Sequence, residues 1–513
     1  MNQLFDNSYL NESLSNGANI LGIFNHPAKS HTFLGRVLFE ELASRGHKVV
    51  FMNGYHNKKE TANFTNIVIE GIAEDLRERE MIYFKHKNDQ LQIIKETLEM
   101  NYLHLSATFQ NEKLKQMIHS NTTFDLIICD YFYNDANLIL GHIFKAPVII
   151  FSSFGNTLAT SHFTGNDLPF SYVPGASSQL SDDMNYWERM KMTISGSLFL
   201  RTLRKSMRKH TELMKRHFDD VPKLSDLYEN VALVLANSHY SFETVRPSTP
   251  NIISIGGFHM HGAKRIDKEI REVMDKAEHG VIFFSLGSQI KSSNMNNDTV
   301  AAIVNTFSKI QSLVLWKFEG SLNFPLPRNV LVKEWFSQTD ILSHPNLRLF
   351  VTHAGLLSMI EAVHYAVPMI AIPFNGDQMM NSKFIETRSI GKLINLESID
   401  SNKFWNILTE VLYNPRYRNN VKYHSHLLRN QPVKPLESAM FWIEHVIEHG
   451  GGPHLKPHSL KLSWYEYYLL DVYAAIIGVA LLVIILLLFI NFIVYSLASN
   501  LLNFREPEKS KQL

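Results

Sequence analysis

The chain has 513 residues, of which 45% are hydrophobic and 19% charged, and its formal net charge is +1. This length exceeds what one hydrophobic core usually serves, so we expect two domains of globular type. The near-neutral charge, without a basic tract interleaved with aromatic residues, argues against a nucleic-acid partner, and the single cysteine, Cys129, excludes an intramolecular disulfide framework.

Residues 1–17 form an atypical N-terminal segment that lacks the apolar stretch of a recognisable signal peptide. From residue 18 onward, ANILGIF, HTFLGRVLFEELASRG and HKVVFMN predict a strand, a helix and a strand. The short apolar runs FDLIICD, APVIIFSS and VALVLANS follow further along. This alternation predicts a doubly wound, Rossmann-like domain over residues 18–258.

The segment 259–279 is charged and only weakly apolar, and we expect a linker there. Residues 280–455 repeat the α/β alternation, with apolar runs at GVIFFSLGS, QSLVLWKF, NVLVKEW, LRLFVTH, VPMIAIP and IGKLIN. The sequence therefore predicts an α/β protein with two parallel, doubly wound sheets.

The C-terminal region predicts a membrane anchor. After a stem at 456–471, rich in tyrosine, residues 472–497 are apolar on every face and long enough to cross a bilayer as a helix. A short tail, 498–513, carries three basic residues, which slightly favours a luminal body. The N-x-S/T sequons at Asn11, Asn63, Asn121 and Asn297 favour the same orientation, whereas the missing signal peptide leaves a cytosolic body behind a tail anchor as the alternative.

A ligand site is predicted where LRLFVTH ends and the helix GLLSMIEAVHYA begins. His353 lies at the carboxyl edge of the sheet and at a helix N-terminus, where phosphates bind, and Gly355 lets a phosphate approach the backbone. Ser358 adds a hydroxyl, and Glu361 adds a carboxylate suited to ribose hydroxyls. Asp377 and Gln378 follow the next strand, so the set indicates a nucleotide that carries a polyhydroxylated group.

The first domain offers a candidate base. His31 follows a strand and begins an amphipathic helix, and Asp130 ends the strand FDLIICD. Adjacent strand ends can bring such a carboxylate to an imidazole, as in Asp–His pairs generally. A competing pattern, HVIEH at 445–449, fits the H-x-x-E-H of inverted zinc proteases, but the sequence predicts no acidic ligand on a helix between this pattern and the apolar span, and we expect no metal.

These stretches together resemble the UDP-glycosyltransferases, in particular the animal membrane-bound branch that includes the UDP-glucuronosyltransferases. The likeness covers nearly the whole chain. It rests on GGFH at 256–259, SLGS at 285–288, VLWKFEG around Trp316, LSWYEYYLLDV before the span, and EWFSQTDILSHPNLRLFVTHAG, which is similar to the family's W-x-P-Q…H-P…T-H-G-G run.

The resemblance implies a GT-B type fold, in which two Rossmann-like domains face a cleft, and an inverting transfer of a hexose or hexuronic acid from a UDP-sugar to a small lipophilic alcohol. His31 would be the base and Asp130 its orienting carboxylate. On the donor side, Trp335 and Gln338 would face the uracil, His353, Ser358 and Gly355 the diphosphate, Glu361 the ribose, and Asp377 and Gln378 the sugar. Ser285, Gly287 and Ser288 of the SLGS turn complete the implied donor set.

The resemblance also implies a single-pass glycoprotein of the endoplasmic reticulum membrane that acts in detoxification, with a UDP-sugar as co-substrate and no cofactor. It leaves a homo-oligomer open. The chain departs from the family at Ser337, Ala354 and Leu357, where many relatives carry proline, glycine and asparagine. The alternative function is therefore a catalytically silent, membrane-anchored protein that binds small molecules on the same fold.

Overall fold

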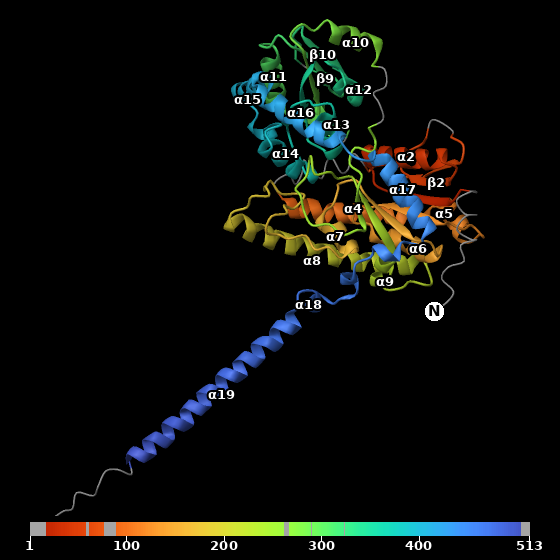
Figure 1. Ribbon diagram of the computed structural model, residues 1–513. Coiled ribbons are helices and arrows are strands. Elements are labelled where there is room, and N and C mark those ends of the chain that lie inside the picture. Colours follow the sequence, from red (N-terminus) through yellow and green to blue (C-terminus); the bar gives the residue numbers. More distant parts are fainter. Residues whose placement is uncertain are drawn as a thin grey trace, which may run out of the picture. The chain divides into compact units, whose positions relative to one another are not determined.

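The computed structural model describes residues 17–57, 61–75, 89–260, 266–288, 290–322 and 324–503. The chain divides into two units, a body that ends at Pro457 and a C-terminal unit that begins at His458. Figure 1 shows the elements of both units. The body contains two separate β-sheets, and each is described here with the helices that cover it.

The first sheet is wholly parallel and has the strand order β3-β2-β1-β4-β5-β6-β7. Its strands are β1 (Asn19–Phe24), β2 (Lys48–Asn53), β3 (Phe64–Val68), β4 (Leu126–Asp130), β5 (Val148–Ser152), β6 (Val231–Ala236) and β7 (Ile252–Ser254). Five of these strands coincide with predicted apolar runs. The two edge strands, β3 and β7, were not predicted.

Successive residues of β1 point to opposite faces of the sheet, so each face has its own apolar core. Ile20 and Phe24 belong to a core that includes helix α2 (Lys29–Ser44), whereas Leu21 and Ile23 belong to the core on the other face. That second face is covered by α4 (Gln90–Gln110), α5 (Glu112–Ile118), α6 (Ile139–Ile143), α7 (Leu158–Thr164), α8 (Tyr186–His217) and α9 (Leu224–Glu229).

The second sheet is also wholly parallel and has the same winding, β10-β9-β8-β11-β12-β13. All six predicted apolar runs form its strands: β8 (Val281–Ser285), β9 (Leu313–Lys317), β10 (Val330–Lys333), β11 (Leu347–Thr352), β12 (Met369–Ala371) and β13 (Gly391–Leu393). The prediction of two doubly wound parallel sheets is therefore confirmed.

Helices cover both faces of this sheet as well. One core takes in side chains of α11 (Asn297–Phe307) and α15 (Ser401–Tyr413). The other takes in α10 (Lys268–Asp275), α12 (Gln338–Leu342), α13 (Leu356–His364), α14 (Asp377–Thr387) and α16 (Pro415–Arg429). Helix α10 lies in the segment expected to be a linker, yet its buried Ile270 and Met274 belong to this core.

The chain returns to the first sheet after α16. Helix α17 (Pro435–Glu448) packs Met440, Ile443 and Val446 into the core that contains β1 and α2. Figure 1 shows this helix among the elements of the first sheet. This helix therefore joins the two halves of the body, although its sequence lies within the range expected for the second domain.

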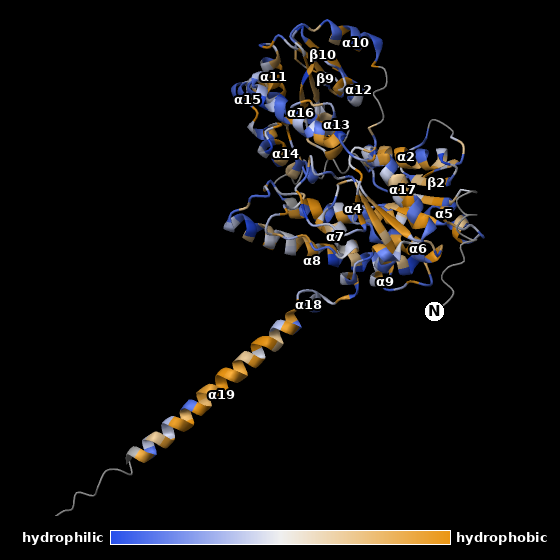
Figure 2. Cartoon of the chain, in the orientation of Figure 1, coloured by the Kyte–Doolittle hydropathy of each residue, from blue (hydrophilic) through white to orange (hydrophobic). Residues whose placement is uncertain are grey.

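The C-terminal unit contains α18 (Trp464–Tyr467) and α19 (Leu470–Asn503). In the described residues α19 is the one helix long and apolar enough to cross a membrane, over Leu470–Leu501, and it contains the predicted span 472–497. Figure 2 shows apolar residues along its length. Because none of this span is buried within the protein, its composition is compatible with a lipid environment.

Candidate active site

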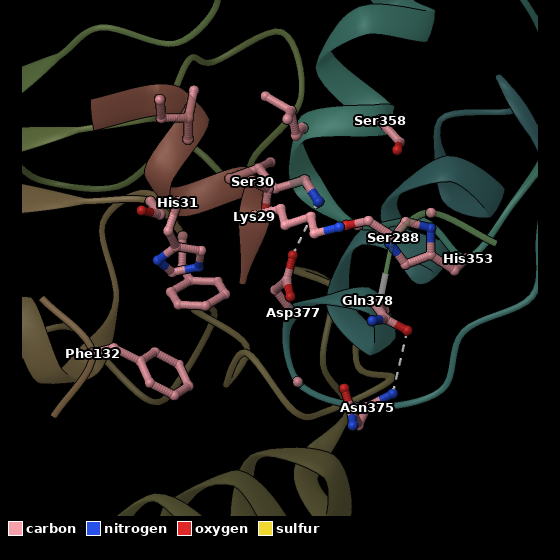
Figure 3. A pocket seen from close by; sticks show the side chains of 18 of the residues that line it. Lys29, Ser30, His31, Phe132, Ser288, His353, Ser358, Asn375, Asp377 and Gln378 are labelled. Carbon is pink, nitrogen blue, oxygen red and sulfur yellow. Dashed lines mark hydrogen bonds between the residues drawn. The ribbon is translucent and has the colours of Figure 1, made fainter. Parts of the chain in front are cut away.

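One cavity of about 530 Å³ lies in the body and is lined by both halves. Its walls come mainly from loops and helix N-termini that follow the carboxyl ends of the two sheets, where open α/β sheets bind ligands. Figure 3 shows its side chains from close by. Of the residues predicted from the sequence, the lining includes His31, Ser285, Gly287, Ser288, Trp335, Gln338, His353, Gly355, Ser358, Glu361, Asp377 and Gln378.

His31 and Asp130 are brought together at the point in the first sheet where β1 lies next to β4. His31 lies in the first turn of α2, and its Nδ1 is 2.6 Å from Oδ2 of Asp130. Both side chains are buried. Because a carboxylate accepts, Nδ1 carries the proton, and Nε2 is the basic nitrogen left for the cavity that His31 lines.

Three further side chains hold this pair, and the sequence did not reveal them. Ser153 donates its hydroxyl to Oδ1 of Asp130 at 2.7 Å, so both carboxylate oxygens are occupied. The ring of His26 stacks on that of His31 at 4.1 Å, and Phe154 packs edge-on at 5.1 Å. Since β5 pairs with β4, the serine pair that ends APVIIFSS was the available signal for Ser153.

His353 lies between two glycines in the second half. A Cβ on Gly287 would come within 2.5 Å of Cε1 of the His353 ring, and a Cβ on Gly355 would come within 2.5 Å of Nε2. Neither position therefore has room for a larger residue unless the imidazole moves. Burial lowers the pKa of His353 to about 4, with a smaller contribution from nearby Lys317. The ring is neutral at pH 7 and has one N–H to donate.

Ala354 follows His353 with a φ of +61°, in the left-handed region. The structure shows that this alanine adopts the conformation that the glycine of the family pattern adopts more readily, at a strain of about 1–2 kcal/mol. Its methyl group is buried in the core beside α13 and is not part of the cavity wall.

Gln338, Ser358 and Glu361 form one hydrogen-bonded group. Nε2 of Gln338 donates to Oγ of Ser358 at 3.0 Å and to Oε2 of Glu361 at 2.6 Å, while Thr339 donates to Oε1 of Glu361 at 3.2 Å. Burial raises the pKa of Glu361 to about 7, although the bonds from Gln338 and Thr339 oppose this rise. Gln338, Ser358 and Glu361, which were expected to contact the uracil, the diphosphate and the ribose, therefore hold one another in place through these hydrogen bonds.

Trp335 presents an exposed ring at the cavity, with 65% of the residue accessible. Nζ of Lys317 lies 5.8 Å from the ring centre, and Lys317 also forms an ion pair with Glu319. Lys317 was not predicted as a site residue; it lies at the carboxyl end of β9 and lines the cavity. Together these side chains offer a flat aromatic face next to a cation.

Asp377 and Gln378 begin α14, directly opposite the first turn of α13. Oδ2 of Asp377 accepts from the backbone N–H of Leu356 at 3.1 Å and from Asn381 at 2.9 Å. Oε1 of Gln378 accepts from the backbone of Phe374 and Asn375, so its amide nitrogen is turned away from that loop. Figure 3 draws the hydrogen bond from the Asn375 backbone to Gln378 as a dashed line. Burial raises the pKa of Asp377, and the hydrogen bonds oppose this.

Comparison with known proteins identifies this arrangement. Residues 25–503 match the model of the family described as UDP-glucoronosyl and UDP-glucosyl transferase. The chain belongs to this family. It is 32% identical to UDP-glycosyltransferase UGT4 of Dactylopius coccus over 499 residues, covering 94% of this chain and 96% of the relative. It is 30% identical to human UDP-glucuronosyltransferase 1A9 over 482 residues, covering 90% and 88%.

Solved structures show the same fold. The crystal structure of UDP-glucose: anthocyanidin 3-O-glucosyltransferase in complex with UDP has a TM-score of 0.56 and 17% sequence identity, covering 84% of this chain and 99% of that one. The fold is therefore of the GT-B type. As a member of the family, the chain is a UDP-glycosyltransferase, whose reaction moves a sugar from a UDP-sugar to an acceptor.

The two walls of the cavity differ in chemistry. The side that belongs to the first sheet is lined largely by apolar and aromatic side chains, whereas the donor-type side chains described above come from the second half. This apolar wall was not predicted from the sequence. It consists of Phe33, Leu34, Ile93, Ile94, Leu98, Tyr131, Phe132, Tyr133, Phe154 and Phe199.

The histidines of the H-x-x-E-H pattern, His445 and His449, lie at the C-terminal end of α17 and do not line the cavity. The rings of His445 and His449 stack at 4.1 Å, and Nε2 of His445 is 3.0 Å from Nε2 of His454. Nδ1 of His449 donates to the backbone oxygen of His445. Within the described residues there is no group of three His, Cys, Asp or Glu side chains arranged to hold a metal ion.

Proposed function

We propose that this UDP-glycosyltransferase is an inverting enzyme that transfers a hexose or hexuronic acid to a hydroxyl of a small lipophilic acceptor, with His31 as the base. The observation that carries the proposal is the buried His31–Asp130 pair, whose His31 lines the same cavity as the polar side chains of the second half. A base on the acceptor wall and a donor site on the facing wall are the two parts that an inverting transfer needs.

The transfer follows from these positions. Nε2 of His31 takes the proton of the acceptor hydroxyl, while the oxygen forms a bond to the anomeric carbon. The bond from that carbon to the UDP oxygen breaks, and the electron pair leaves with the diphosphate. Attack from the face opposite the leaving group inverts the anomeric centre. Asp130 stabilises the imidazolium that forms and fixes the tautomer of His31 beforehand.

The second half supplies the donor contacts. The neutral imidazole of His353 donates an N–H to the diphosphate, and the N-terminus of α13, which follows Gly355, favours the developing negative charge. Trp335 offers its exposed ring to the uracil. The group of Gln338, Ser358 and Glu361 holds the nucleoside, with the Glu361 carboxyl placed for the ribose hydroxyls.

Asp377 and Gln378 bind the transferred sugar in this proposal. Both hydrogen bonds that Asp377 makes to neighbouring residues use Oδ2, so Oδ1 is the oxygen that meets a sugar hydroxyl. The amide nitrogen of Gln378 adds a donor. In this proposal no metal ion takes part, and the diphosphate is held by a hydrogen bond from the neutral imidazole of His353 and by the N-terminus of α13.

The apolar wall supports a lipophilic acceptor. The rings of Phe132 and Phe154 are in contact, with their centres 5.0 Å apart, and both rings pack edge-on against the ring of His31. A flat apolar molecule that packs against these rings gains about 25 cal/mol per Å² of apolar surface removed from water. Its hydroxyl is then held within reach of Nε2 of His31.

A membrane location completes the proposal. Helix α19 anchors the chain in the endoplasmic reticulum membrane, and the body lies in the lumen. The sequon residues Asn63, Asn121 and Asn297 are all exposed, as glycosylation requires, whereas Asn11 lies outside the described residues. Protease and glycosidase treatment of intact microsomes tests the orientation. Digestion of the body without detergent, or no shift on glycosidase treatment, would contradict it.

The experiment that tests the reaction offers the full chain a mixture of UDP-glucose, UDP-glucuronic acid, UDP-galactose and UDP-N-acetylglucosamine with a panel of phenols. Mass spectrometry of the products identifies the sugar and the acceptor together. We expect one acceptor-linked hexose or hexuronic acid of inverted configuration by NMR. Binding of UDP without any conjugate would instead support the alternative of a catalytically silent binding protein.

A further inference from the structure

A buried cluster of polar side chains contacts the strand that ends in Asp130. None of its members is more than 5% exposed, and none lines the cavity. The cluster consists of Asn25, Asn134 and Asn137, with Asn101 and Thr108 of α4 at its margin. Polar side chains are costly to bury unless they are hydrogen-bonded, so such a cluster calls for a role beyond the filling of space.

The centre of the cluster is Asn25, which directly follows β1. Its Oδ1 accepts from Nδ2 of Asn134 at 2.9 Å and from Nδ2 of Asn137 at 3.2 Å. Its Nδ2 donates to Oγ1 of Thr108 at 2.9 Å and to Oδ1 of Asn137 at 3.2 Å. Both N–H groups and the oxygen of this amide are engaged, and a network satisfied in this way is rigid.

Asn134 connects the cluster to the turn that follows β4. Its Oδ1 accepts from the backbone N–H of Phe132 at 3.0 Å, and its Nδ2 donates to the backbone oxygen of Asp130 at 2.9 Å. Within this turn, Tyr133 has a φ of +56°, a left-handed conformation that is strained for a tyrosine. The side chain of Asn134 therefore holds a strained turn in place directly after the Asp130 carboxylate.

The cluster also reaches the apolar wall of the cavity. Nδ2 of Asn101 donates to the backbone oxygen of Phe132 at 2.7 Å. Phe132, labelled in Figure 3, and Tyr133 line the cavity, and so do Ile94 and Leu98 from the helix that carries Asn101. One buried network thus connects helix α4, the turn after β4 and the end of β1.

We infer that Asn25 and Asn134 are positioning residues for the proton transfer that the proposed function, on which this inference rests, assigns to His31. Asn25 is followed by His26, whose ring stacks on that of His31, and Asn134 binds the backbone of the residue that orients the imidazole. The hydrogen bond between the two amides therefore joins the end of β1, which leads to the base, to the end of β4, which carries its carboxylate. A displacement of about 1 Å at a reacting group can cost about 100-fold in rate.

The acidity of the acceptor separates this role from a general contribution to stability. A phenol needs a base to become a good nucleophile, whereas its nitro-substituted form is more acidic and depends less on that base. A misplaced His31 should therefore slow transfer to the phenol more than transfer to the nitrophenol. A loss of folded protein would slow both transfers equally.

The test compares Asn134→Ala with Asn329→Ala in the full chain. Nδ2 of Asn329 donates to the backbone oxygens of Phe307, Ile310 and Ser312, so this control also loses three hydrogen bonds, at a residue that does not line the cavity. Steady-state rates with both acceptors, UDP affinity by calorimetry and the denaturant midpoint are measured for each protein. Thr108→Val, which is close in volume and removes only an acceptor for Asn25, is the second variant if Asn134→Ala does not fold.

We expect kcat with the phenol to fall by about 10- to 100-fold in Asn134→Ala, kcat with the nitrophenol to fall less, and UDP affinity to be kept. Thr108→Val should show a smaller loss with the same preference. Asn329→Ala should lose stability and keep both rates. Equal falls for the two acceptors, or full rates in a folded Asn134→Ala or Thr108→Val, would overturn the inference. Absence of transfer by the unmutated chain would instead overturn the proposed function, and this inference with it.

Discussion

At the scale of single residues, the chemistry depends on side chains that are held before any substrate binds. His31 is fixed by Asp130 on one side and by the stacked ring of His26 on the other. Asp130 has both oxygens engaged, by His31 and Ser153. A base held in this way loses little conformational entropy when the transition state forms, so the free energy of activation is lower.

The first prediction concerns Asp130→Asn. The amide is uncharged and can donate a hydrogen bond to Nδ1 of His31, which favours the wrong tautomer. The imidazolium that forms during the reaction also loses the negative charge that stabilises it. We expect kcat to fall by about 10² to 10⁴. UDP affinity, measured by calorimetry, should stay unchanged because the donor contacts belong to the second half. A Ser153→Ala variant should lose less activity, and the reverse order of effects would contradict the assignment.

The second prediction concerns Asp377→Asn. Asparagine keeps an oxygen for the N–H of Leu356, which alanine would leave without a partner. It loses the charged acceptor that we assign to a sugar hydroxyl. A lost hydrogen bond to a charged group costs about 1.5–3 kcal/mol, so UDP-sugar affinity should fall by about 10- to 100-fold. UDP affinity should not change, and an equal loss for UDP would remove Asp377 from the sugar site.

The third prediction concerns the buried carboxyl of Glu361, whose pKa is raised by burial from 4.5 to about 7. Between these values the folded protein binds more protons than the unfolded chain. The free energy of unfolding therefore falls as pH rises from 4.5 to 7, by up to about 3 kcal/mol from this group. In Glu361→Gln this decline should be absent. Parallel denaturant titrations of both proteins across this range measure it, and identical pH profiles would contradict it.

At the scale of elements, the turns around His353 show why particular backbone positions matter. Gly287 has a φ of +79°, and a Cβ there would collide with the His353 ring. Ala354 shows that this site tolerates a left-handed alanine where the methyl group has room. Space beside the imidazole, more than backbone conformation alone, therefore decides which of these positions requires glycine.

The fourth prediction follows from this contrast. Gly287→Ala should push His353 out of place and reduce UDP affinity by about 10- to 100-fold, the cost of one hydrogen bond to a charged group. Gly71→Ala is the matched control, because Gly71 also has a positive φ, +87°, but its Cβ would meet nothing within 4 Å. Each variant should lose about 1–2 kcal/mol of stability from strain. Equal UDP affinity in the two variants would contradict the role of Gly287.

In the first sheet the sequence predicted the buried strands and missed the two edge strands, whereas in the second sheet it also predicted the partly buried edge strands β10 and β13. The strands β1, β4, β5, β6 and β8 are buried almost throughout, so they appear as continuous apolar runs. Strand β3 (FTNIV) has polar residues at two of its five positions, and β7 (IIS) ends in a serine after two apolar residues, so neither produces a continuous apolar run. The return of α17 to the first sheet is a long-range packing choice that local periodicity does not report.

At the scale of the whole molecule, the site exists only because two separately wound sheets face one cavity. The polar candidates could be predicted because each follows an apolar run, at the edge where parallel sheets bind ligands. The apolar wall could not. Ile93, Leu98 and Phe199 lie on helices, where apolar residues are ordinary, and only the fold shows that they line the cavity.

The central claim is that His31 removes the acceptor proton while the second half holds the donor. Its most direct test is His31→Ala in the full chain, with turnover of an alcohol acceptor and affinity for UDP-sugar measured on the same preparation. We predict that turnover falls by about 10² to 10⁴ while UDP-sugar affinity is retained. Near-normal turnover by this variant, shown to be folded, would contradict the account and assign the base to another residue.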